Sequence, residues 1–250
     1  MRREALFFER QVIYKASCSS TNTVALQFLS TGKVPEGTVF ITDHQYSGRG
    51  QRGSVWTSEP YKNLTCSVIL YPSFLAARKS FALNIITTLA IQQVIAPYVP
   101  HGLTIKWPND IYYQNQKLGG ILIESLLKGK YSRAAVIGIG LNVNQESFTW
   151  PTLTSLALVC KRTFSLRNLL ADLLAALEIN YTQLREQGIA LLQAHYLKNL
   201  YWIDESHTFR AQRQTFQGII RGIDAVGRLV VEQASGITKH YDCKEITFVT

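Results

Sequence analysis

The sequence predicts an α+β fold, with a mixed β-sheet flanked by helices and then a small SH3-like β-barrel at the C-terminus. Strand-like β-branched segments alternate with longer apolar segments of helical length over residues 11–200. From about Ser206 the pattern changes to five short strand-like segments separated by turn residues. A hydrophobic fraction of 46% over 250 residues is typical of a globular chain. We therefore expect two domains, residues 1–205 and 206–250.

The first domain is expected to begin with a strand, a short helix and a second strand. Residues 11–16 are predicted as a strand, and residues 19–22 (Ser-Ser-Thr-Asn) are typical of a helix N-cap. The helix at 23–29 is expected to end before Gly32 and Pro35, and residues 38–42 form the next strand. The polar, glycine-containing residues 43–60 are predicted as a long loop, and loops of this length are usually functional or disordered.

Strands then dominate the middle of the chain, and helices follow them. Residues 76–96 are predicted as a long buried helix, which Pro97 and Pro100 close. The expected strands are 63–71, 103–106, 111–113, 119–125 and 133–143, and the later amphipathic helices are 166–184 and 189–200. The short barrel strands are 208–212, 216–223, 228–232, 236–241 and 245–249. An extension of the main sheet is the alternative for this last segment.

Charge and cysteine usage restrict the class of protein. The net charge of +9 favours an anionic partner, although a solvated basic surface is an equal alternative. The four cysteines (18, 66, 160 and 243) form no CxxC pair, so we expect buried reduced thiols. Residues 5–8 are too short an apolar segment for a signal peptide or a membrane span. These features predict a cytoplasmic protein.

Three segments contain residues suited to binding an anionic ligand. Residues 47–53 (Ser-Gly-Arg-Gly-Gln-Arg-Gly), here called the glycine-rich loop, combine glycines that permit close backbone approach with the guanidinium groups of Arg49 and Arg52. Residues 106–110 (Lys-Trp-Pro-Asn-Asp) precede Lys117, which lies before a double glycine. Residues 138–144 place glycines within a strand next to Asn142. A surface turn, a hairpin end and a β-bulge are the respective structural alternatives.

Taken together, these segments resemble the biotin–protein ligases. The matching residues are Ser20-Thr21-Asn22, the glycine-rich loop, the 106–110 segment, the KxxGIL-type segment 117–122 and the GxGxN segment 138–142, in that order along the chain. Residues 221–224, with Gly227 and Leu229, also look like the small C-terminal domain of that family. The resemblance implies a class II synthetase-like sheet of the biotin–lipoate ligase type.

The resemblance also implies a two-step reaction. Biotin and ATP give biotinyl-5′-AMP, and a lysine of a biotin carboxyl carrier protein or domain then takes the biotinyl group. Catalytic roles would fall to Lys117, Arg49, Arg52 and Asp110, with Asp110 orienting the incoming lysine. Biotin would contact Ser20, Thr21, Asn22, Gln45, Gly48, Arg49 and Lys117. The adenylate would contact Arg49, Arg52, Trp56, Lys117 and Asn142. Mg²⁺ is expected with ATP, without assigned ligands.

Two departures and two alternatives accompany this resemblance. Many family members carry a basic residue where this chain has Gln51, so we expect slightly leaky release of biotinyl-AMP. The short segment before the first strand leaves no room for an operator-binding domain, so we expect no operator DNA among the partners. A homodimer through an open edge strand is compatible with the sequence. The alternatives are a lipoate or octanoate–protein ligase, and a basic nucleic-acid-binding protein that uses the barrel aromatics Phe209, Phe216, Tyr241 and Phe248.

Overall fold

A seven-stranded mixed sheet forms the centre of the first domain. The computed structural model describes residues 11–129 and 131–249, without the side chains of Arg52 and Lys128. The strand order is β1-β2-β5-β9-β8-β7-β6, in which β1 and β2 are parallel and all other neighbours are antiparallel. The strands are β1 (Val12–Cys18), β2 (Val39–Gln45), β5 (Leu64–Leu70), β6 (Leu103–Lys106), β7 (Asp110–Tyr113), β8 (Gln116–Lys128) and β9 (Tyr131–Leu141).

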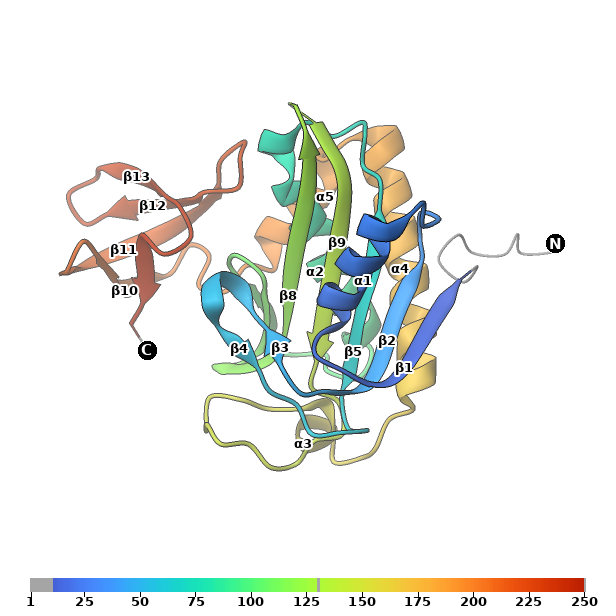
Figure 1. The fold of residues 1–250 in the computed structure, drawn as a ribbon. Helices are drawn as coiled ribbons and strands as arrows, with labels where there is room; N and C mark the ends of the chain where they lie inside the picture. Colours follow the sequence, from blue (N-terminus) through green and yellow to red (C-terminus); the bar gives the residue numbers. More distant parts are fainter. Residues whose placement is uncertain (1–10, 130, 250) are drawn as a thin grey trace.

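Helices cover both faces of this sheet (Figure 1). Helix α1 (Thr21–Thr31) packs on one face, against β2, β5 and β9. Helices α2 (Phe81–Ile95), α4 (Leu166–Gln187) and α5 (Ala190–Lys198) lie on the other face, where α2 contacts the sheet and both other helices. Every residue of β5 is buried, because a strand between two helical layers has no solvent-facing side. The predicted α+β class with flanking helices is confirmed.

The α1 face of the sheet changes character along its strands. On β9, Val136 packs in the small core under α1, whereas Gly138 and Gly140 occupy the next positions on the same face. The alternate residues Ile137 and Ile139 belong to the large core on the opposite face. Hydrophobic packing is therefore continuous behind the sheet, while part of its front face lacks large side chains.

The C-terminal domain is a separate five-stranded antiparallel sheet (Figure 1). Its strands are β10 (Ser206–Ala211), β11 (Gln214–Ile223), β12 (Leu229–Gln233), β13 (Thr238–Tyr241) and β14 (Ile246–Phe248). The five predicted strands are thus confirmed, and the alternative of an extended main sheet is wrong. Phe209 is fully buried and packs against Phe216 and Phe248. These aromatic rings form a core, which removes the stacking platform that a nucleic-acid-binding barrel needs.

Some predicted elements differ from the structure. The supposed loop at 43–60 contains a hairpin of β3 (Gly48–Arg49) and β4 (Val55–Trp56), joined by the 3₁₀ turn η2 (Gln51–Gly53). The predicted 76–96 helix is divided into η3 (Ala77–Lys79) and α2. Helix α3 (Leu156–Cys160) was not predicted, since a single short turn leaves no measurable periodicity.

Two predictions about cellular setting can be compared with the described part of the chain. Among its helices, none has the length and apolar character needed to cross a membrane. Buried reduced thiols were predicted for all four cysteines; Cys18 and Cys66 are buried, whereas Cys160 and Cys243 are only partly buried.

Candidate active site

A cavity of about 240 Å³ lies on the α1 face of the sheet, beneath the β3–β4 hairpin. It brings together side chains from segments that are far apart in the sequence. Most of the predicted site residues line it, namely Ser20, Thr21, Asn22, Gln45, Arg49, Trp56, Asp110 and Lys117. Asn109 and Gln51 line it as well.

Glycines on β8 and β9 make room for this cavity. Gly120 pairs with Gly140, and Gly138 pairs with Leu122. A Cβ added at Gly138 would lie 2.3 Å from Oδ1 of Asn22, and one at Gly140 would lie 2.6 Å from the Trp56 ring. Both distances are far shorter than a carbon contact permits. The strand glycines are therefore required by the close approach of two site side chains.

One end of the cavity carries an ion pair. Lys117 Nζ lies 2.7 Å from Asp110 Oδ1, and both side chains are about three-quarters covered by protein. The Lys117 ammonium also lies 6.0 Å from the centre of the Trp56 ring. An ammonium in this position can stabilise a second negative group that enters the cavity, because it is only partly solvated and already oriented.

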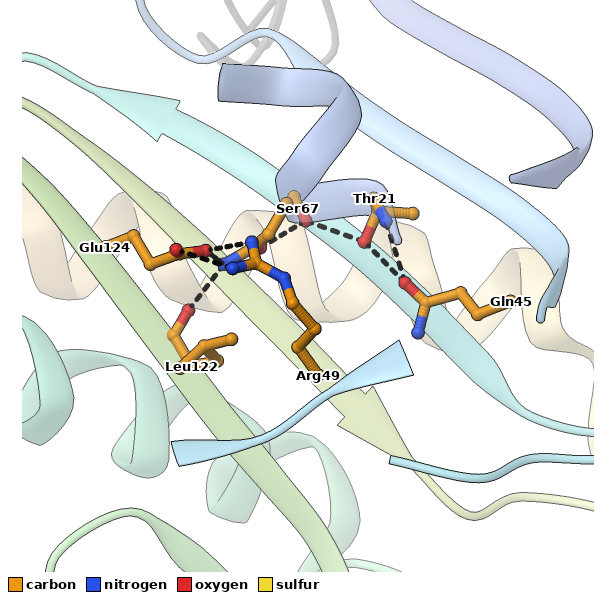
Figure 2. A network of polar contacts seen from close by, with 7 residues as sticks. Thr21, Gln45, Arg49, Ser67, Leu122 and Glu124 are labelled. Carbon is orange, nitrogen blue, oxygen red and sulfur yellow. Dashed lines mark hydrogen bonds and ion pairs between the residues drawn. The ribbon is translucent and has the colours of Figure 1, made fainter. Parts of the chain in front are cut away.

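At the other end, Thr21, Asn22 and Gln45 line the cavity and belong to a chain of hydrogen bonds that continues to the buried Ser67 behind them (Figure 2). Gln45 Oε1 accepts from the Thr21 backbone N–H at 2.8 Å and from its hydroxyl at 3.2 Å. Ser67 Oγ lies 2.7 Å from Thr21 Oγ1 and 2.6 Å from Asn22 Oδ1. Buried polar groups with fixed partners form a rigid surface that selects a ligand by its donors and acceptors.

Arg49 reaches from β3 to Glu124 on β8 (Figure 2). Its two terminal nitrogens donate to the two carboxylate oxygens at 3.0 and 2.7 Å, which is a bidentate pair. Neither Glu124 nor Ser67 was predicted from the sequence. The signal that was available for Glu124 is a single acidic residue within the apolar segment 121–127.

Several predicted residues lie outside the cavity lining. Asn142 is buried, and its side-chain amide donates to the Thr154 carbonyl at 3.0 Å. Gly48 lies directly under the Trp56 carbonyl, where an added Cβ would be 2.3 Å from that oxygen. The Arg52 side chain falls outside the described part of the structure.

The 106–110 segment is divided between two environments. Asn109 and Asp110 line the cavity, whereas Trp107 is buried and its Nε1 donates to the Gly227 carbonyl at 2.9 Å. The Lys106 ammonium lies 4.6 Å from the centre of the Tyr112 ring, among further aromatic side chains. Burial lowers the pKa of Lys106, and the nearby Asp110 carboxylate opposes this shift. The segment therefore joins the cavity to the C-terminal domain.

Among the described residues that line the cavity, one buried side-chain donor has no hydrogen-bond partner, and no metal cage is formed. Nothing in the described residues accepts a hydrogen bond from the buried Nε1 of Trp56. Across residues 11–129 and 131–249, no three His, Cys, Asp or Glu side chains gather closely enough to hold a metal ion. The arrangement thus suits a small ligand with an anionic group and polar ring atoms.

Comparison with known proteins agrees with this site. Residues 14–142 match the model of the biotin/lipoate A/B protein ligase family, and residues 208–243 match the biotin protein ligase C-terminal domain. The bifunctional ligase/repressor BirA of Bacillus spizizenii is 31% identical over 237 residues, covering 93% of this chain and 72% of the relative. The biotin–[acetyl-CoA-carboxylase] ligase of Mycobacterium tuberculosis is 29% identical over 227 residues, covering 89% and 84%.

A solved structure also shares the fold. The biotin protein ligase from Aquifex aeolicus in complex with biotin and ATP superposes with a TM-score of 0.79 at 22% identity, covering 95% of this chain and 98% of that one. Fold and cavity together define a ligase that acts on small anionic substrates. The chain belongs to the biotin/lipoate A/B protein ligase family, in its biotin–protein ligase branch.

Proposed function

We propose that the cavity beneath the β3–β4 hairpin is where this ATP-dependent biotin–protein ligase forms biotinyl-5′-AMP before transferring the biotinyl group to a protein lysine. The observation that carries the assignment is the Lys117–Asp110 pair at one end of a cavity whose other end is lined by fixed polar groups. The first step brings the biotin carboxylate against the α-phosphate of ATP. Two anions approach each other there, so a cation placed in advance supplies the largest stabilisation.

The two ends of the cavity suit different parts of the substrates. Lys117 contributes positive charge near the reacting carboxylate and phosphate, and Arg49 adds positive charge from the biotin side of the cavity. Thr21, Asn22 and Gln45 supply donors and acceptors for the ureido ring of biotin, with Ser20 and the backbone of the glycine-rich loop beside them. Their shared hydrogen bonds fix the direction in which each group points.

The adenine base is assigned to the side of Trp56. Its indole lies against Gly140 and has an unused Nε1 donor, so it offers both a stacking face and a hydrogen bond. Asn142 is assigned as an adenine contact. To bind the base, its side-chain amide must give up its hydrogen bond to the Thr154 carbonyl. Arg52 is assigned as a phosphate ligand because it belongs to the glycine-rich loop.

Mg²⁺ is assigned as a companion of ATP and not as a resident ion. The acidic side chains nearest the cavity already have cationic partners, Asp110 with Lys117 and Glu124 with Arg49. Magnesium commonly keeps several waters and binds through substrate phosphates plus one or two carboxylates. Asp110 is the side chain in the cavity that fits this role, and the ion would neutralise phosphate charge.

The second step transfers the biotinyl group to an acceptor lysine. Asp110 is assigned to orient the incoming amine and accept its proton, since its carboxylate faces the same cavity. The acceptor is a biotin carboxyl carrier protein or domain. The buried thiols of Cys18 and Cys66 support a cytoplasmic setting, where thiols stay reduced. A homodimer also remains a prediction, supported by the exposed Val12 and Tyr14 on edge strand β1.

Mass spectrometry of the reaction with ATP, Mg²⁺ and biotin tests the assignment. We expect biotinyl-5′-AMP, and we expect Lys117→Ala to slow its formation by about 100-fold or more. Lys33→Ala removes an exposed lysine elsewhere and serves as the matched control. Formation of an adenylate with lipoate or octanoate, but not with biotin, would refute the assignment of biotin as the substrate. Full activity in Lys117→Ala would refute the role of this lysine.

A further inference from the structure

The Arg49–Glu124 pair connects the roof of the cavity to its floor strand (Figure 2). Arg49 belongs to the glycine-rich loop and lines the cavity. Glu124 belongs to β8, two residues beyond the cavity-lining Leu122 and on the same side of that strand. The two parallel hydrogen bonds, at 2.7 and 3.0 Å, fix the distance and the plane of both groups.

The same carboxylate also holds a third element. Glu124 Oε2 accepts a hydrogen bond from Asn22 Nδ2 at 2.8 Å, and Asn22 is 2% exposed in the first turn of α1. Asn22 Nδ2 further contacts the Leu122 carbonyl at 3.1 Å. The side chain of Asn22 fits here because Gly138 has no Cβ. Glu124 therefore joins the glycine-rich loop, the start of α1 and strand β8 at a single point.

Glu124 does not itself line the cavity. A bare carboxylate beside an anionic ligand would repel it, whereas the charge of Glu124 is paired with the guanidinium of Arg49, which does line the cavity. Glu124 must therefore act through Arg49 and Asn22, so it is a positioning residue. Arg49 keeps donors that the bidentate pair does not use, because a guanidinium carries five N–H groups. It can hold Glu124 and contact a ligand at the same time.

We propose that Glu124 and Arg49 form a clasp, which holds the glycine-rich loop closed over the biotin end of the cavity and slows release of the bound molecule. The ligand named here rests on the proposed function. The clasp opens when the ion pair breaks, and this frees the two-residue strand β3 to lift away from β8. The second ion pair, Lys117–Asp110, stays in place at the other end.

Glu124→Gln tests the clasp, because glutamine keeps the shape of the side chain and removes the charge and one acceptor. We expect biotin and biotinyl-5′-AMP to dissociate about fivefold faster, the scale set by a partly exposed ion pair. We also expect faster trypsin cleavage after Arg49 in the ligand-free protein. In a protein that also carries Arg49→Met, Glu124→Gln should no longer speed dissociation, whereas a purely structural role would leave the two effects on dissociation additive. Cleavage at position 49 is compared only between proteins that keep Arg49, because trypsin cuts after arginine or lysine. Glu232→Gln, which removes one of the two acidic partners of Arg221 on the C-terminal domain, is the matched control.

Each outcome decides one part of the inference. Unchanged cleavage and unchanged dissociation in Glu124→Gln would overturn the clasp. Slower dissociation would also overturn it, because Glu124 would then compete with the ligand for Arg49. A third outcome is that trypsin cleavage rises in Glu124→Gln while biotin protects the loop from trypsin in neither the unchanged protein nor the variant. That result would support the clasp and would refute the assignment of biotin to the cavity. Additive effects in the double variant would reduce Glu124 to a structural residue.

Discussion

Replacing Gly140 by alanine should impair nucleotide use and leave the fold intact. The added Cβ would lie 2.6 Å from Cε2 and Cζ2 of Trp56 and 3.0 Å from its Cδ2. Ordinary carbon contacts begin near 3.5 Å, so the indole and the strand must separate by about 1 Å. The backbone itself accepts alanine, because Gly140 is absent from the positive-φ glycines.

The size of the effect depends on whether the Trp56 indole or strand β9 moves to accommodate the added Cβ. Trp56 lies on the two-residue strand β4, whereas Gly140 lies within β9 between two hydrogen-bonded neighbours. The hairpin is the softer partner, so we expect the indole to move. Overpacking of this kind costs about 1–3 kcal/mol. If half of that cost is removed from adenine binding, the KM for ATP rises by about two- to twelvefold.

The assay is ATP-dependent pyrophosphate release at saturating biotin, together with thermal unfolding. Gly32→Ala is the control, because no atom lies within 4 Å of its added Cβ and its φ of 175° is ordinary extended backbone. A normal KM for ATP in a folded Gly140→Ala protein would refute the placement of adenine at Trp56. A large fall in Tm would show that the sheet yields instead of the indole.

Three further predictions concern stability and release. Trp107→Phe deletes the hydrogen bond to the Gly227 carbonyl, so the free energy of urea unfolding should fall by about 1–2 kcal/mol. Burial raises the pKa of the Cys66 thiol to about 12, so the folded state keeps its proton. The protonated thiol therefore favours the folded state fully below about pH 9. As the pH rises toward 12, the free energy of unfolding falls by roughly 1.4 kcal/mol per pH unit. Urea unfolding of Cys66→Ala should lack this slope, and an identical slope would contradict the reasoning. Gln51→Arg should reduce escape of biotinyl-5′-AMP, measured by trapping with a free amine, and equal trapping would exclude leakage through this position.

The sequence predicted the elements whose pattern is set by burial. Residues 63–71 were predicted as a strand, and all residues of β5 are indeed buried, including the polar Thr65 and Ser67. The apolar part of the predicted 76–96 helix is present as α2, and the five C-terminal strands, predicted from their spacing between turn residues, are present as well. Sheet order was not predictable in this way, because the position of β9 between β5 and β8 depends on long-range pairing.

Prediction of the site succeeded where a motif carries several residues and failed where one residue acts alone. Asp110 and Lys117 come from adjacent segments and meet in the cavity. Glu124 and Ser67 lie in mainly apolar stretches of their strands and belong to no multi-residue motif, so neither spacing nor composition marks them. The β3–β4 hairpin was expected as loop, since two-residue strands are too short to show alternation. Asn142 shares a motif with the strand glycines, yet its side chain is directed to the Thr154 carbonyl.

The contact between Trp107 and Gly227 limits how this protein can be recombined with others. The turn at Gly227 has a φ of +91°, and a Cβ there would lie 2.1 Å from the Phe81 side chain. The C-terminal domain is therefore fitted to the start of α2 and to the segment that carries Asp110. A chimera with a foreign C-terminal domain needs a glycine with the same backbone geometry at this turn. Without that glycine, the grafted C-terminal domain would displace the segment that carries Asp110. An exchange of this domain that is intended to change the acceptor protein would then also disturb the proposed active site.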